Sequence, residues 1–123
     1  MPKKILLVDD SSTARLATRM LFGDKTNYEI VSACDGKEGL ETAIREHPDL
    51  ILMDIEMPRM SGLEACKLLK QNGATRKIPV VLLTMRGGED YVQEGYASGC
   101  SDFLTKPVNG QKLAAVIKTH LGE

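Results

Sequence analysis

Residues 49–54 read DLILMD, an aliphatic run enclosed by two aspartates. The run at 50–53 is continuously apolar, which is typical of a strand covered on both faces in a parallel sheet. Residues 5–8 and 79–83 have the same character. These three runs predict the centre of a parallel sheet.

Working outward from the centre, residues 28–33 and 102–105 are two further predicted strands. Apolar residues recur at helical spacing between the strands and after the last one, so strand and helix alternate five times. A chain of alternating strands and helices with right-handed connections forms an open sheet with helices on both faces. Ligands of such a sheet bind beyond the carboxyl ends of its strands. The helical positions are Leu16, Ala17, Met20 and Leu21; Leu40, Ala43 and Ile44; Leu63, Cys66 and Leu69; and Leu113, Val116, Ile117 and Leu121.

Local signals mark the starts of several helices. Asp35 and Asn109 are predicted N-caps, and Ser61 with Glu64 three residues later forms a capping box. The helix predicted over residues 89–97 has the weakest pattern and follows two glycines. We expect that helix to be mobile.

The chain has 123 residues, which predicts one domain over residues 1–123. Its 16 basic and 17 acidic residues leave a net charge of -1, which produces no long-range electrostatic attraction for nucleic acid. We therefore expect no nucleic-acid binding. No apolar run approaches the ~20 residues that span a bilayer, which predicts no membrane segment. Cys34, Cys66 and Cys100 lie far apart and are interpreted as reduced core thiols of a cytoplasmic protein.

Polar residues stand where four predicted strands end. Asp9 and Asp10 follow the first strand, Asp54 the third, Thr84 the fourth and Lys106 the fifth. Carboxylates on adjacent strands repel one another unless a cation lies between them, and hard oxygen ligands favour Mg²⁺. The sequence therefore predicts a divalent metal site at this edge of the sheet.

A carboxylate beside such a metal can act as a nucleophile and form an acyl phosphate, and Asp54 is the best candidate. Mg²⁺, the Lys106 ammonium and the Thr84 hydroxyl can then hold the phosphoryl oxygens from different sides. Any one of these residues alone would more often be a helix cap or a surface charge. Their shared position at strand ends favours a functional site.

At this point the chain resembles the receiver domains of two-component response regulators over its whole length. The resemblance implies a single α/β domain of the flavodoxin-like (CheY-like) fold, with five parallel strands in the order 2-1-3-4-5 and five helices on both faces. The segments that carry it are residues 5–10, 49–58 with Gly62, 80–84 and 99–107.

The resemblance also implies roles for the site residues. Asp54 is the phosphoacceptor, Asp10 and Asp54 bind Mg²⁺ directly, and Asp9 assists through water. The backbone carbonyl of Glu56 completes the metal ligands, and Lys106 contacts the phosphoryl group.

Two further features follow from the resemblance. Thr84 and Phe103 match the switch positions, where the hydroxyl moves toward the phosphoryl group and the aromatic ring turns inward behind it. The Lys106–Pro107 peptide bond is expected to be cis, an isomer that proline makes accessible.

Three residues match family positions that tune the lifetime of the phosphoryl group. Met85 stands where the family usually has a small residue, so its thioether is expected to cover part of the phosphoryl site. Glu56 and Arg86 have opposite charges and are expected to pair.

The resemblance implies a histidine kinase or a His-phosphotransfer protein as phosphodonor, and no catalysis beyond the domain's own phosphorylation and dephosphorylation. Since the chain stops after the fifth helix, we expect a stand-alone protein. Its downstream target would bind the face formed by the fourth helix, fifth strand and fifth helix. Lys112 and Val116 replace the acid and arginine that pair in dimeric family members, which predicts a monomer.

Other functions use related features. A phosphorelay shuttle or phosphate sink would need the same acceptor but no output. A flavodoxin-like FMN carrier is a minor alternative, because Asp9 and Asp10 would repel the FMN phosphate. A haloacid-dehalogenase-type phosphohydrolase is a second minor alternative, but it needs an Asp where this chain has Glu56.

Overall fold

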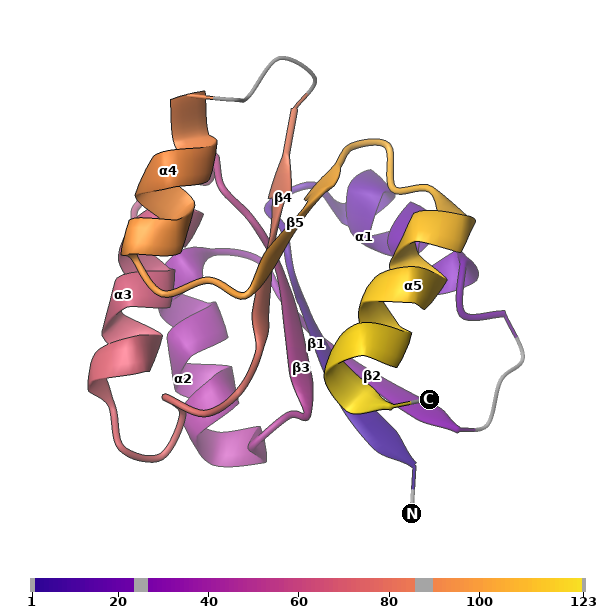
Figure 1. The fold of residues 1–123 in the computed structure, drawn as a ribbon, viewed down its shortest axis with the longest axis horizontal. Helices are drawn as coiled ribbons and strands as arrows, with labels where there is room; N and C mark the ends of the chain where they lie inside the picture. Colours follow the sequence, from indigo (N-terminus) through magenta and orange to yellow (C-terminus); the bar gives the residue numbers. More distant parts are fainter. Residues whose placement is uncertain (1, 24–26, 86–89, 123) are drawn as a thin grey trace.

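A parallel sheet with helices on both faces makes up the computed structural model, which describes residues 2–23, 27–85 and 90–122 (Figure 1). The strand order is β2-β1-β3-β4-β5, and every neighbouring pair is parallel. The predicted fold is thereby confirmed. Along the chain the elements are β1 (Lys3–Val8), α1 (Ser12–Met20), β2 (Tyr28–Ala33), α2 (Gly36–Glu46), β3 (Leu50–Asp54), α3 (Gly62–Gln71), β4 (Val80–Thr84), α4 (Asp90–Ala97), β5 (Asp102–Thr105) and α5 (Gly110–Leu121).

The three continuously apolar runs lie at the centre of the sheet. Every residue of β3 and β4 is buried, and β3 pairs with β1 on one side and β4 on the other. Both strands extend one residue beyond the predicted runs. Asp54 pairs with Leu83 and Thr84 with Thr105, so these polar residues are held by the sheet ladder.

The sheet separates two hydrophobic cores. Ile51 and Met53 of β3 pack into the first core, with α2 and α3, whereas Leu50 and Leu52 pack into the second, with α5. This alternation follows from the period of two along a strand. In Figure 1, α2, α3 and α4 lie on one side of the sheet and α1 and α5 on the other.

Side-chain caps begin four of the helices. Asp35, Ser61 and Asn109 accept hydrogen bonds from backbone N–H groups in the first turns of α2, α3 and α5, which confirms the predicted caps. Ser11 caps α1 in the same way and was not predicted. The predicted helix 89–97 is present as α4, although residues 86–89 lie outside the described part of the chain.

The three cysteines differ in burial. Cys66 and Cys100 are buried, as predicted, and burial raises the pKa of the Cys100 thiol to about 12. The prediction that Cys34 is a core residue was wrong, because this side chain is exposed just after the edge strand β2. Its Sγ lies 3.1 Å from Glu38 Oε2.

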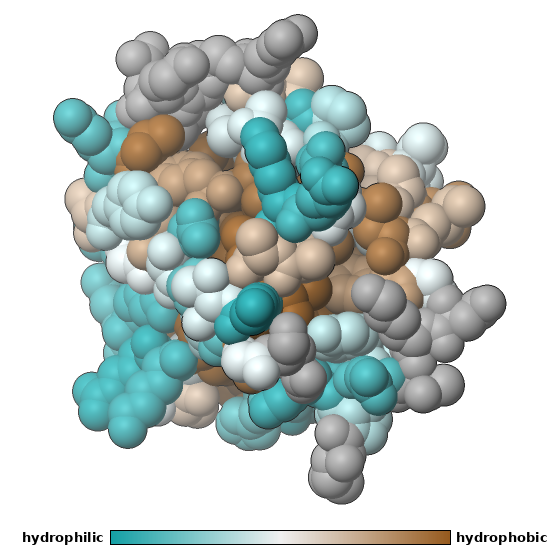
Figure 2. All heavy atoms as spheres, turned by 45° about the vertical axis from the view of Figure 1, so that its right-hand side comes forward, coloured by the Kyte–Doolittle hydropathy of each residue, from teal (hydrophilic) through white to brown (hydrophobic). Residues whose placement is uncertain are grey.

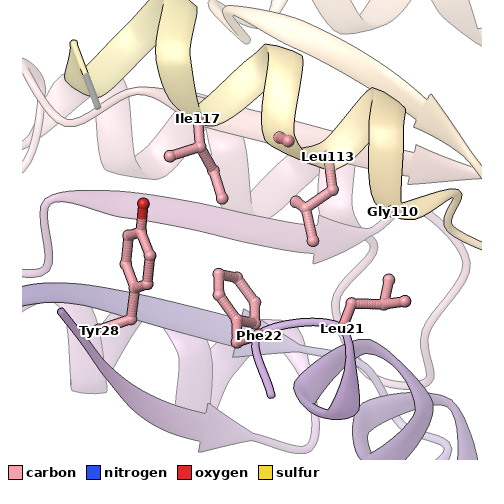
Figure 3. Close-up of a pocket in the computed structure, with 7 residues that line it drawn as sticks. Leu21, Phe22, Tyr28, Gly110, Leu113 and Ile117 are labelled. Atoms are coloured by element: carbon pink, nitrogen blue, oxygen red, sulfur yellow. The ribbon is translucent and has the colours of Figure 1, made fainter. Parts of the chain in front are cut away.

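A hollow of about 110 Å³ lies on the side of α1 and α5. Figure 3 shows Leu21, Phe22 and Tyr28 across from Leu113 and Ile117. Figure 2 turns this side forward and shows hydrophobic atoms between hydrophilic side chains. None of the residues lining the hollow belongs to the predicted metal site. Among the described residues, no helix has the length and apolarity needed to cross a membrane.

Candidate functional site

Three carboxylates meet at the carboxyl edge of β1 and β3. One ligand oxygen from each of Asp9, Asp10 and Asp54 lies within 4.8 Å of the others. The register explains this, because Val8 pairs with Met53 and the next residues along the chain are Asp9 and Asp54. Asp9 and Asp54 are buried, whereas Asp10 is exposed. The structure thus brings the predicted acidic residues together.

Lys106 reaches this cluster from the end of β5. Its Nζ lies 3.0 Å from Asp9 Oδ2 and 3.0 Å from Asp54 Oδ2. Its backbone N–H donates to the carbonyl of Thr84 at 2.8 Å, which fixes the lysine to the end of β4. The Lys106–Pro107 peptide bond is cis. One ammonium group is therefore shared by two buried carboxylates.

The electrostatics of the site favour a further positive charge. Burial raises the pKa of Asp54, the hydrogen bond from Lys106 opposes this shift, and the nearby Asp9 charge adds to it. Burial alone would lower the pKa of Lys106, but its hydrogen bonds to Asp9 and Asp54 outweigh burial and raise it. With all groups ionised, three carboxylates and one ammonium leave two excess negative charges.

The donor set fits a hard divalent cation. Mg²⁺ takes oxygen ligands and is usually bound through one or two carboxylates, with water and phosphate oxygens in the other positions. Asp9, Asp10 and Asp54 offer such oxygens, and the exposed Asp10 leaves the cluster open on one side. Glu56, whose carbonyl is a predicted ligand, is an exposed residue just beyond β3.

The start of α1 holds Asp9 in place. The N–H of Ser11 donates to Asp9 Oδ1 at 3.0 Å, and the Arg15 guanidinium donates to the Asp9 backbone carbonyl. Asp9 is therefore fixed through its side chain and its backbone. Sequence reasoning missed Arg15, although its place on the first turns of the helix after Asp9 was a usable signal.

A glycine at the start of α3 determines the backbone behind Asp54. A Cβ at Gly62 would lie 2.2 Å from the Asp54 carbonyl oxygen, so only glycine fits there. The Gly62 N–H donates to the Ile55 carbonyl at 2.8 Å, while the Ile55 N–H donates to the Leu83 carbonyl at 3.0 Å. The chain after Asp54 thus leaves the sheet and comes back against Ile55 seven residues later, where α3 begins.

The two predicted switch residues lie on neighbouring strands. Thr84 is buried at the end of β4, and its hydroxyl donates to the Met85 carbonyl at 3.3 Å. The Phe103 ring packs against Tyr96 with centroids 5.2 Å apart. Gly95 leaves room for this ring, since a Cβ there would lie 2.2 Å from Phe103 Cζ. The structure holds the aromatic ring on α4.

The predicted lifetime-tuning residues are placed only in part. Met85 directly follows β4 and is 60% exposed. Glu56 is also exposed. Arg86 lies outside the described residues, so its predicted pairing with Glu56 stays a prediction.

The sheet order and the acidic edge define a known class of signalling domain. The chain belongs to the response regulator receiver domains, whose family model matches residues 5–118. The polar-differentiation response regulator DivK of Brucella anthropi is 36% identical over 126 aligned positions, which cover 100% of this chain and 99% of that protein.

Solved structures agree with this assignment. The chemotaxis protein CheY4 of Vibrio cholerae is 32% identical, with 98% of this chain and 99% of that chain covered and a TM-score of 0.88. The receiver domain of the sensor histidine kinase PA1611 from Pseudomonas aeruginosa PAO1 is 24% identical with full coverage of both chains and a TM-score of 0.89. That domain has a magnesium ion coordinated in its active site cleft. The family match favours the receiver function over the two minor alternatives, the FMN carrier and the phosphohydrolase.

Proposed function

We propose that this receiver domain accepts a phosphoryl group on Asp54, in a Mg²⁺-dependent reaction, from a histidine kinase or a His-phosphotransfer protein. The observation that carries the proposal is the surroundings of Asp54. Its carboxylate is buried, lies 3.0 Å from the Lys106 ammonium, and is clustered with Asp9 and Asp10. A nucleophile, a phosphoryl-binding cation and a metal-binding donor set thus share one edge of the sheet.

The chemistry follows from these positions. A carboxylate oxygen of Asp54 attacks the phosphorus of a phosphohistidine, a P–O bond forms, and the P–N bond breaks with its electron pair on the imidazole, which takes up a proton. Lys106 remains beside the acceptor and holds an oxygen of the transferred group. Asp9, Asp10 and Asp54, with the Glu56 carbonyl, would hold Mg²⁺, which supplies positive charge to the phosphoryl oxygens.

The signal leaves through a protein partner in this proposal. Thr84 moves toward the phosphoryl group, and the Phe103 ring follows away from Tyr96, which changes the face of α4, β5 and α5. Tyr96 is 51% exposed on that face and available to a target. Val116, at the position of the pairing arginine of dimeric members, is buried in the second core, which supports a monomer.

Phosphorylation by a small donor tests the proposal. Mg²⁺ and acetyl phosphate are expected to add one phosphoryl group, seen by intact mass spectrometry, and Asp54→Asn or EDTA should abolish the addition. Asp10→Ala should do so by removing metal binding. Labelling that persists unchanged in Asp54→Asn would contradict the assignment. A phosphorelay shuttle would additionally return its phosphoryl group to a purified His-phosphotransfer protein.

A further inference from the structure

The loop between β3 and α3, residues 55–61, has supports on two sides. At its base the Gly62 N–H donates to the Ile55 carbonyl at 2.8 Å, which joins the two ends of the loop. Its outer side, formed by Arg59 and Met60, lies against the start of α2. That helix supplies none of the predicted site residues. Because the loop carries Glu56, whatever fixes its outer side also fixes a proposed metal ligand.

The first outer support is Gly36, the first residue of α2. Its backbone is not in the left-handed region, and alanine is the better helix former, so helix geometry does not require glycine there. The neighbouring Met60 does require it. A Cβ at Gly36 would lie 2.6 Å from the Met60 carbonyl oxygen and 3.0 Å from Met60 Cβ. A backbone oxygen cannot yield unless the loop itself moves.

The second outer support is an ion pair. Arg59 Nη1 lies 3.6 Å from Asp35 Oδ2, and Arg59 has a left-handed backbone with φ of 70°. Asp35 is 7% exposed and is fixed as the N-cap of α2, where it accepts from the Glu38 N–H at 2.8 Å. The Arg59 side chain is 77% exposed, so this pair restrains the loop less than the contact at Gly36.

We infer that Gly36, assisted by the Asp35–Arg59 pair, is a positioning residue for the metal site, which seats the β3–α3 loop so that the Glu56 carbonyl can join the carboxylates. The inference rests on the proposed function, because it presumes Mg²⁺ at Asp9, Asp10 and Asp54. It extends the site to the start of α2, which contains none of the proposed metal ligands and not the phosphoacceptor.

The test is a Mg²⁺ titration followed by ¹H–¹⁵N correlation spectra, which report the fold and the Kd in one measurement. Residues behind metal ligands typically contribute about 10–100-fold to affinity, so Gly36→Ala is expected to raise the Kd at least about tenfold. Gly73→Ala is the matched control, since Gly73 has nothing within 4 Å of its added Cβ and no left-handed backbone. The control should bind like the wild type.

Two further variants keep the test decisive if Gly36→Ala fails to fold. Asp35→Asn keeps the cap and removes the charge, and Arg59→Gly suits the left-handed backbone and removes the pair. Each should raise the Kd by about two- to fivefold, and by less at high salt. A folded Gly36→Ala that binds Mg²⁺ like the wild type, or an unfolded one together with unchanged Kd values in both other variants, overturns the inference. A wild type that binds no Mg²⁺ overturns the proposed function instead.

Discussion

Lys106→Met should destabilise the metal-free protein strongly, although the residue belongs to the proposed phosphorylation site. The substitution keeps the length of the side chain and removes the ammonium that lies 3.0 Å from both Asp9 and Asp54. Two buried carboxylates would then face each other without a positive charge between them. The protein must either retain this repulsion or bind a proton.

The structure sets the size of the effect. Removing one partner of a buried ion pair costs about 3–5 kcal/mol. The Lys106 side chain is 18% exposed and the neighbouring Asp10 is open to water, so solvent screens part of the repulsion. We therefore expect the lower end, about 3 kcal/mol, which corresponds to a fall in Tm on the order of 10 °C.

Urea unfolding at pH 7 in EDTA measures this difference. Lys112→Met is the matched control, because Lys112 is exposed on α5, and its effect should stay within about 0.5 kcal/mol. Mg²⁺ should stabilise Lys106→Met more than the wild type, since the metal replaces the missing charge. A Lys106→Met protein within about 1 kcal/mol of the wild type in EDTA would refute the reasoning.

Two other outcomes are expected. Burial raises the folded pKa of Asp54 above its unfolded value, so its ionisation costs stability at neutral pH. Asp54→Asn should therefore stabilise the metal-free protein at pH 7, and pH-dependent urea unfolding should show this gain shrinking as the pH falls toward the unfolded pKa of about 3.9 and vanishing well below it. Sedimentation with and without beryllofluoride should give a 13.5 kDa monomer in both states, because Val116 is buried where dimeric members have an arginine, and a tight activated dimer would contradict this expectation.

Much of the fold could be predicted because burial leaves a direct pattern. The run at 50–53 has no polar residue and is short, which favours a strand covered on both faces over a buried helix. The strand ends were less certain, since Asp54 and Thr84 are polar but still pair in the ladder. Cys34 was misplaced because cysteine is usually buried, and its position at the sheet edge depends on tertiary structure.

The site was predicted as a set of residues but not as a set of contacts. Convergence of Asp9, Asp10 and Asp54 follows from strand order alone. The sharing of Lys106 between two carboxylates depends on side-chain paths across β4, which no spacing encodes. For the same reason the pair between Asp35 and Arg59 could not be found, because the two residues come from different βα units.

The separation of the two cores by the sheet has an evolutionary consequence. A substitution at Cys66 changes the packing under α3, whereas one at Ile117 changes the packing under α5, and a full sheet lies between them. Free-energy effects of such distant changes are close to additive. The residues of one helical layer can therefore change during evolution until that layer binds a new partner protein. The layer on the opposite side of the sheet can meanwhile keep the partner that it already binds. Such changes need not alter Asp9, Asp10 or Asp54, because none of these residues belongs to either core.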